Sequence, residues 1–372
     1  MGLANYAEHF LKTCGMTREA LLVPGRKFEA TLKAKVPHLY EEMQGIAAGS
    51  GQEVIDIVLL NSRFEIVLTA GDAHAQLKMM DGCSTYGQIY NAQVWAAQNW
   101  DWQSNQKDQL VHLVISPAGK PKCHILTEGG LVGKIGINEA GVVINVNAIK
   151  ATNLDTSKLP IHVLLRVPLE CANREDAVQR MGELGAASVG HVSVVPLPTR
   201  IGRAESFQVM ISDPSGISSL ETNPDGPWAA NHLDSHGRVF HTNHLIVPDR
   251  SASMREVFFL KDTGPRLARL KQLVDETLAA ILLKGAGVNG TTNGVNGANG
   301  VNRVQDKALP SHESIFQLLK DEQGAPFGIC RAGTTEMPSE TIFSIVRNCS
   351  ERRSRVAIGR PCDVKEWVEL AF

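Results

Sequence analysis

Apolar side chains in the first part of the chain recur with the period of a helix. Phe28, Leu32, Val36 and Tyr40 are four residues apart, and a similar pattern continues to about residue 60. Side chains at this spacing lie on one face of an α-helix. The pattern therefore predicts a helical N-terminal segment that starts near Tyr6.

After Asp81 the pattern changes to short runs rich in Val, Ile and Thr that are broken by glycine. Such runs are typical of strands joined by tight turns. Strands are expected at residues 110–115, 133–137, 141–146, 191–195, 206–211 and 238–241, helices at 161–169, 174–184 and 253–284, and a terminal hairpin at 341–346 and 355–359. This order of elements predicts an α+β body built in layers.

Residues 285–302 form a low-complexity segment with the sequence GAGVNGTTNGVNGANGVN. It contains no charge and no large side chain, so it cannot bury enough apolar surface to offset the entropy that ordering removes. We expect a flexible surface insertion within the layered body.

The composition is that of a globular protein, with 372 residues, of which 43% are hydrophobic and 20% charged. Lys and Arg total 37 against 39 Asp and Glu, which gives a formal net charge of -2. That balance provides no global field for phosphate backbones or anionic lipid. Neither nucleic acid nor a membrane is therefore an expected partner.

No targeting signal is identified in the sequence. It has no run of about 18 apolar residues, and its start lacks the basic, apolar and small-residue pattern of a signal peptide. The last residues, 369–372, do not form a peroxisomal address. The expected location is the cytoplasm.

The seven cysteines are odd in number, scattered and without a C-x-x-C pair. Reduced thiols fit this pattern better than a zinc site or a redox dithiol. The 12 histidines show no H-E-x-x-H spacing, so a metal hydrolase is disfavoured and no metal is expected. A papain-like site is open in principle, but Cys83 lies outside the C-G-x-C-W context of those enzymes.

Cys83 follows Gly82 directly, at the point where the helical pattern gives way to strands. A thiol can attack the carbonyl of its own preceding residue, and the attack is easiest where that residue has no side chain to resist a strained backbone. Cleavage between Gly82 and Cys83 would expose an α-amino group whose pKa, typically near ~8, suits a general base. The dipeptide alone also fits an ordinary buried cysteine.

Further motifs lie in order along most of the chain, at Tyr40–Gly49, Leu59–Arg63, Asp81–Thr85, Gln98–Asp101, Thr127–Asn138, His241–His244, Pro326–Arg331 and Gly359–Pro361. With these motifs the sequence resembles the acyl-coenzyme A:6-aminopenicillanic acid acyltransferase family, also called isopenicillin N acyltransferases, of the N-terminal-nucleophile hydrolase superfamily. So many matches in the same order are hard to obtain by chance.

The resemblance implies a four-layer αββα sandwich and self-cleavage in front of the nucleophilic cysteine. Residues 1–82 would then become a small (α) subunit and residues 83–372 the catalytic (β) subunit. The two fragments are expected to stay together in one αββα body.

The resemblance also assigns roles to residues around Cys83. Thr85 would bond the thiol or the amine, and Asp101 would orient the amine and tune its basicity. Asn243 would donate to the oxyanion of a tetrahedral intermediate, which is worth roughly 3 to 4 kcal/mol. Arg331 would bind a carboxylate, of Asp101 or of a substrate, with its two-pronged guanidinium.

The chain departs from the family pattern in three places. Its start is short by about one strand and the following turn, so we expect either an incomplete edge of the first sheet or a true start that lies upstream. The segment 285–302 has no counterpart, and the peroxisomal ending of penicillin-forming members is missing.

The resemblance implies an enzyme of secondary metabolism, as in antibiotic biosynthesis. It would transfer an acyl group from acyl-CoA or an amide, through a Cys83 thioester, to an amine of a small peptide-like substrate. The alternative is an amidohydrolase that uses the same acyl-enzyme; an inactive processed scaffold is a third interpretation. No cofactor is expected, with acyl-CoA serving as co-substrate, and the partners are a small-molecule acyl donor and an amine or amide.

Overall fold

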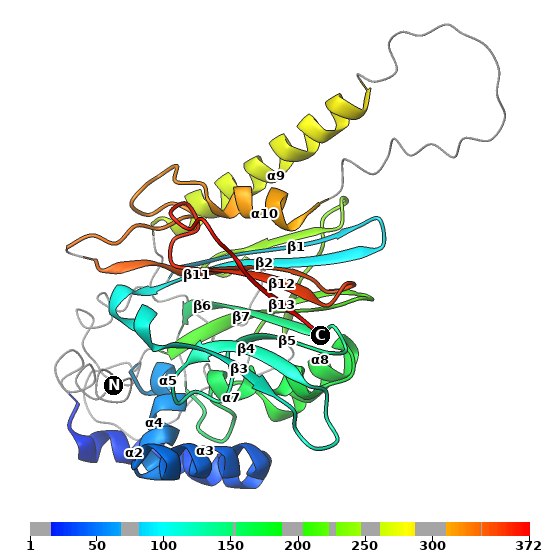
Figure 1. Ribbon diagram of the computed structural model, residues 1–372. Coiled ribbons are helices and arrows are strands. Elements are labelled where there is room, and N and C mark those ends of the chain that lie inside the picture. Colours follow the sequence, from blue (N-terminus) through cyan, green and yellow to red (C-terminus); the bar gives the residue numbers. More distant parts are fainter. Residues whose placement is uncertain are drawn as a thin grey trace, which may run out of the picture.

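The computed structural model describes residues 16–67, 82–151, 154–187, 204–222, 228–246, 261–286, 310–335 and 337–372. Two antiparallel sheets lie face to face, and helices cover the outer face of each (Figure 1). The predicted four-layer αββα, α+β architecture is confirmed. The strand expected at 191–195 and residues 287–302 of the expected insertion lie outside the described residues.

The N-terminal part is helical, as predicted, over α2 (Arg18–Lys35), α3 (Pro37–Ser50), α4 (Val54–Asn61) and α5 (Arg63–Val67). Thr17 caps α2, because its side chain accepts a hydrogen bond from the backbone N–H of Ala20. The helix ends before Pro37, which disfavours helical backbone at Val36. The periodic run from Phe28 to Tyr40 is therefore shared between two helices.

One sheet has six strands in the order β10 (Arg238–His241), β1 (Gly82–Tyr90), β2 (Gln93–Gln103), β11 (Ser339–Asn348), β12 (Arg353–Ile358) and β13 (Val368–Ala371). β1 and β2 form a hairpin whose tight turn places Asn91 and Ala92 at positive φ. The predicted terminal hairpin is confirmed as β11 and β12, with Arg352 at its turn.

The second sheet has seven strands in sequence order, β3 (Leu110–Ile115), β4 (Cys123–Glu128), β5 (Ile135–Asn138), β6 (Val143–Ala151), β7 (Ala204–Asp213), β8 (Gly216–Glu221) and β9 (Ala229–Asn231). The described side chains of β4, β5 and β6 are buried on both faces, because the other sheet covers one face and helices the other.

The helices between residues 161 and 184 differ in part from the prediction. The helix expected at 161–169 is a short α7 (Ile161–Leu164) followed by a 3-10 turn, η2 (Val167–Glu170), because Pro168 cannot donate the next helical hydrogen bond. The helix expected at 174–184 is confirmed as α8 (Arg174–Leu184). A further 3-10 turn, η1 (Ser104–Gln109), follows β2.

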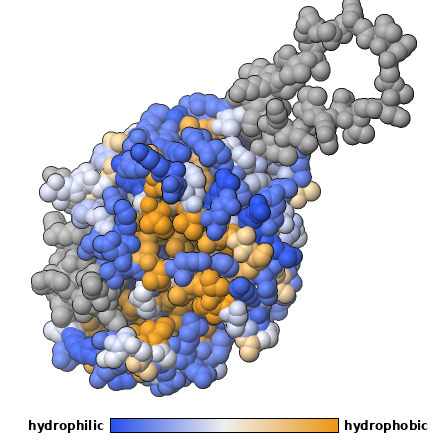
Figure 2. Space-filling view, in the orientation of Figure 1, coloured by the Kyte–Doolittle hydropathy of each residue, from blue (hydrophilic) through white to orange (hydrophobic). Residues whose placement is uncertain are grey.

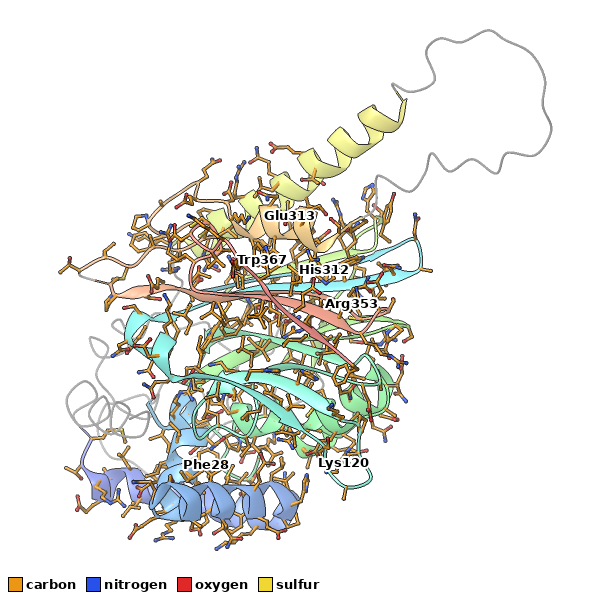
Figure 3. The ribbon with its side chains drawn as sticks, in the orientation of Figure 1. Phe28, Lys120, His312, Glu313, Arg353 and Trp367 are labelled. Carbon is orange, nitrogen blue, oxygen red and sulfur yellow. The ribbon has the colours of Figure 1, made fainter. Side chains whose placement is uncertain are left out.

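Two helices cover the six-stranded sheet, α9 (Thr263–Ala286) and α10 (His312–Leu319) (Figure 1). In Figure 3, Trp367 lies below α10, where its ring centroid is 3.6 Å from that of Phe316. Hydrophobic residues gather over the middle layers on the face seen in Figure 2. None of the helices in the described ranges is long and apolar enough to span a bilayer.

Candidate active site

Gly82 and Cys83 are the first two residues of β1, which pairs with β2 in the centre of the six-stranded sheet. Gly82 lies directly across from Asp101, and Cys83 across from Trp100. Cys83 is 2% exposed. The candidate nucleophile is therefore held by pairing with β2, and the pairing of β1 with β10 begins two residues later, at Thr85.

Gly82 has no room for a side chain. A Cβ at this position would lie 2.6 Å from Asp101 Oδ2, 2.8 Å from Arg331 Nη2 and 2.9 Å from Arg331 Nε. The sequence argument for glycine rested on backbone freedom alone. The structure adds a second reason, since the two charged side chains occupy the space in which a Cβ would stand.

Asp101 is fully buried and bonded through both carboxylate oxygens. Oδ1 accepts a hydrogen bond of 2.6 Å from Thr341 Oγ1, and Oδ2 accepts one of 3.2 Å from Arg331 Nε. Burial raises the pKa of Asp101 to about 6, although Arg331 and Arg266 act in the opposite direction. The predicted association of Asp101 with Arg331 is present.

Asp262 joins Arg331 to a second arginine. Its Oδ2 accepts hydrogen bonds of 2.5 Å from Arg331 Nη2 and 2.8 Å from Arg266 Nε. Burial opposes ionisation, but the two guanidinium groups outweigh it and hold the pKa of Asp262 below its ordinary value. Asp101, Arg331, Asp262 and Arg266 thus form an alternating chain of two negative and two positive groups.

Arg266 extends this chain to the nucleophile. Its Nη1 donates to the carbonyl of Cys83 at 2.8 Å and to Ser84 Oγ at 3.2 Å, and its Nη2 donates to Asn243 Oδ1 at 2.9 Å. Arg266 is 2% exposed, so these contacts are formed away from bulk water. They fix the peptide groups on the C-terminal side of Cys83.

Asn243 contacts the backbone of Cys83 directly. Its Oδ1 accepts a hydrogen bond of 2.8 Å from the Cys83 N–H, and its Nδ2 donates to the carbonyl of Ala148 at 2.9 Å. The backbone N–H of Asn243 donates to Thr263 Oγ1. In the uncut chain the side-chain oxygen of Asn243 thus holds the amide nitrogen that cleavage would turn into the α-amine.

Thr85 lies two residues beyond Cys83 on the same strand and is 1% exposed. Its hydroxyl donates to Asn147 Oδ1 at 2.8 Å and lies 3.4 Å from the carbonyl of His241. These contacts join β1 to β6 and β10. The resemblance implied a bond from Thr85 to the thiol or amine of Cys83, whereas these hydrogen bonds go to the neighbouring strands.

The side chain of Cys83 faces a small, mainly apolar cavity between the sheets. Residues from both sides of the predicted cut line it, namely Phe64, Cys83, Trp100, Lys134, Val146, Ala148, Ile161, His162 and Leu165. Phe64 stacks on His162 with ring centroids 4.9 Å apart. One wall of this cavity belongs to the N-terminal segment, through Phe64.

Sequence analysis missed four polar residues of this region, Lys134, Asp262, Arg266 and Thr341. Arg266 had a readable signal, because it precedes Leu270 and Val274 at spacing four on the buried face of α9. An arginine in an apolar stripe needs a buried partner. Thr341 and Asp262 carried no comparable signal, since both are common residue types at the end of an element.

The described residues contain no group of three or more His, Cys, Asp or Glu side chains placed to hold a metal ion. The six cysteines in the described ranges are free thiols. The polar groups that the described residues bring to this site are the Cys83 thiol, the carboxylates, the guanidinium groups, the Lys134 amine and the Asn243 amide.

The chain is similar to proteins of one described family. The model of the family described as acyl-coenzyme A:6-aminopenicillanic acid acyl-transferase matches residues 90–285. The acyl-coenzyme A:6-aminopenicillanic-acid-acyltransferase 40 kDa form of Emericella nidulans is 30% identical over 349 residues, which cover 93% of this chain and 82% of that protein.

Two solved structures show a more distant likeness. A variant of conjugated bile acid hydrolase from Clostridium perfringens is 11% identical with a TM-score of 0.48, over 78% of this chain and 92% of that one. The N-acylethanolamine-hydrolyzing acid amidase ortholog of Caenorhabditis elegans is 13% identical with a TM-score of 0.42, over 72% and 93%. These likenesses are too remote to support an assignment of activity.

Proposed function

The chain belongs to the acyl-coenzyme A:6-aminopenicillanic acid acyl-transferase family, and from this premise we propose that it is a self-cleaving cysteine acyltransferase. Cleavage occurs between Gly82 and Cys83, and Cys83 then carries the acyl group as a thioester. The observation that supports the proposal most directly is the set of side chains that contact this peptide bond. Asp101 and Arg331 leave no space for a side chain at Gly82, while Asn243 and Arg266 bind both backbone groups of Cys83.

Self-cleavage begins when the thiolate of Cys83 attacks the carbonyl carbon of Gly82. The C–N bond to Cys83 breaks, its nitrogen takes up a proton, and a thioester joins Gly82 to the sulfur. Water then hydrolyses the thioester, which leaves a carboxylate on Gly82 and a free amine and thiol on Cys83. The missing side chain at Gly82 allows the strained backbone that the attack needs.

In turnover the new α-amine of Cys83 acts as the general base for its own thiol. Asn243 Oδ1 already accepts a hydrogen bond from this nitrogen, so the amine can donate to the same oxygen after the cut. Asn243 Nδ2 is the proposed donor to the oxyanion, and it would exchange its bond to Ala148 for that contact. The carboxylate of Asp101 orients and stabilises the cationic form of the amine.

The substrates follow from the family and from the cavity. The Emericella relative is named for acyl-coenzyme A and 6-aminopenicillanic acid, and we propose an acyl thioester donor and a small amine acceptor for this chain also. The side chains that line the small cavity beside Cys83 are mainly apolar, so we propose an acyl group with an apolar chain, which the cavity must open to admit. The two fragments remain together, because Phe64 and Cys83 line the same cavity.

Intact mass after expression tests the proposal. Dividing 40.4 kDa in proportion between residues 1–82 and 83–372 gives fragments of roughly 9 and roughly 31 kDa, as expected for a self-exposed nucleophile. The Cys83→Ala variant should remain whole. An uncut wild type would reject the proposal. Purified cut enzyme is then given an acyl-CoA with and without 6-aminopenicillanic acid; amide product indicates transfer, and free acid alone indicates hydrolysis.

A further inference from the structure

Lys134 is a buried cation that the proposed turnover does not use. It is 1% exposed and directly precedes β5. Its Nζ donates to Glu128 Oε1 at 2.6 Å, and Glu128 Oε2 lies 2.9 Å from Arg63 Nη2. Burying charged groups is costly, so Lys134 and its ion-pair partners are candidates for a functional role.

Three observations place Lys134 beside the nucleophile. Cys83 and Trp100 are direct partners across β1 and β2, so their side chains lie on the same face of the sheet. Lys134 Nζ is 2.9 Å from the ring centroid of Trp100. Cys83 and Lys134 also line one cavity. The ammonium group and the thiol therefore face the same small space.

The uncut chain lacks the base that serves turnover. The nitrogen of Cys83 is still an amide that donates to Asn243, so it cannot take the proton from the thiol. Asp101 and Asp262 are bonded to the arginines on the Gly82 side. Among the residues that the structure describes, the candidates for another proton acceptor lie on the cavity side of Cys83.

We propose that Lys134 is the proton acceptor for the Cys83 thiol during self-cleavage, an inference that rests on the proposed function. The neutral amine of Lys134 takes the proton of the thiol and leaves a thiolate beside an ammonium group. The thiolate attacks the carbonyl carbon of Gly82, and as the C–N bond breaks the ammonium returns the proton to the departing nitrogen of Cys83. No proton is gained or lost over this step.

The electrostatic surroundings suit this exchange. Burial lowers the pKa of Lys134 to about 7, although Glu128 acts in the opposite direction; Arg63 lowers it further and Cys83 raises it. His162, a second titratable group among the described residues that line the cavity, is a poorer base, because burial moves its pKa well below the ordinary value. Near neutral pH a substantial fraction of Lys134 is therefore a neutral amine.

The test follows the rate of self-cleavage by mass spectrometry in full-length protein from pH 5.5 to 9.5. The wild-type rate should rise with pH around a midpoint near 7. Lys134→Met should cut at least 100-fold more slowly at pH 7, with its remaining rate rising only toward the pKa of an unassisted thiol, about 8.5. Lys122→Met, a change of an exposed lysine just before β4, should cut like the wild type.

Two more variants separate proton transfer from support of the fold. Lys134→Arg keeps the buried charge but cannot accept a proton, so it should also fail at pH 7. Glu128→Gln removes the charge that raises the pKa of Lys134, so the midpoint of the pH profile should move to lower pH. If Lys134→Met does not fold, the Lys134→Arg and Glu128→Gln variants still test the role of Lys134. Folding of each variant is judged by its melting temperature, compared with that of the uncut Cys83→Ala protein.

The outcomes keep the two proposals apart. An uncut wild type at every pH rejects the proposed function itself. A wild type that cuts while Lys134→Met or Lys134→Arg cuts at the same rate leaves the proposed function standing and overturns the role of Lys134. An unchanged midpoint in Glu128→Gln overturns it as well.

Discussion

Asp101 lies directly across from Gly82 in the pairing of β1 with β2, and its Oδ2 is 2.6 Å from the point where a Cβ of residue 82 would stand. The carboxylate proposed to orient the new amine is thus also the group that requires glycine before the cut. Gly82 and Asp101 are 19 positions apart in the sequence, but the Asp101 carboxylate both limits the size of residue 82 and provides a negative charge beside the peptide bond to be cut.

Replacing Gly82 with alanine should block self-cleavage. The new Cβ would lie under 3 Å from Asp101 and Arg331, both buried and bonded, so the strand or the charge pair must shift. We expect the cutting rate to fall by at least about 100-fold, since small displacements at a reacting bond have effects of this size. Gly45→Ala is the control, because a Cβ there meets nothing within 4 Å. A Gly82→Ala protein that cuts at the rate of Gly45→Ala would contradict the steric argument.

Arg266→Met should slow both self-cleavage and turnover. The change removes charged hydrogen bonds to the Cys83 carbonyl and to Asn243, and bonds of this type are worth about 1.5 to 3 kcal/mol. The expected loss is therefore roughly 10-fold to 100-fold in rate. Lys271→Ala, which changes an exposed residue of the same helix, should have no effect on the time course of cutting. If the two variants cut at equal rates, Arg266 does not contribute to self-cleavage.

The carboxyl group of Asp101 should make stability fall as pH rises. Its pKa is about 6 in the folded protein, above the ordinary value of about 4, so the folded state binds the proton more tightly. The stabilisation is present below about pH 4 and is lost as pH rises through 6, with a magnitude of roughly 3 kcal/mol. Urea unfolding of Cys83→Ala with and without Asp101→Asn, at pH 4.5 and 7.0, measures it. If both proteins show the same pH dependence, Asp101 is already ionised at pH 4.5.

Elements with local signals were predictable from the sequence. The helix at 174–184 has such signals at both ends, because Asn173 caps its start and Gly185 at positive φ ends it. β3 and β10 were also predicted with their observed bounds, from short apolar runs between turn residues. α10 was missed although Ser311 and Ser314 form a capping box, because eight residues give little periodicity.

Only those residues of the candidate site that lie close together in the sequence could be predicted from local sequence. Cys83 and Asp101 stand in short motifs next to each other in one hairpin, so local reading and family resemblance found them together. Arg266 and Lys134 reach the same peptide from other elements, and their partners are set by how the layers stack. That arrangement depends on packing across the whole body, which no window of sequence contains.

The last prediction concerns the wall that Phe64 contributes from the N-terminal side of the cut. Phe64→Leu should keep self-cleavage and enlarge the cavity beside Cys83, because the ring of Phe64 lines that cavity and stacks on His162. One methylene in an apolar pocket changes kcat/KM by about 10-fold or more, so we expect a shift of this order in favour of bulkier acyl donors.

Phe28→Leu provides the matched control, because Phe28 is fully buried on the same N-terminal side but does not line the cavity. In Figure 3 it lies on α2, in the outer helical layer. Both variants should lose stability, but only Phe64→Leu should change the ratio of kcat/KM between long and short acyl donors. An altered ratio in both variants would point to a general loosening of the fold. An unaltered ratio in Phe64→Leu would mean that the acyl group lies elsewhere, and the cavity beside Cys83 would then serve only self-cleavage.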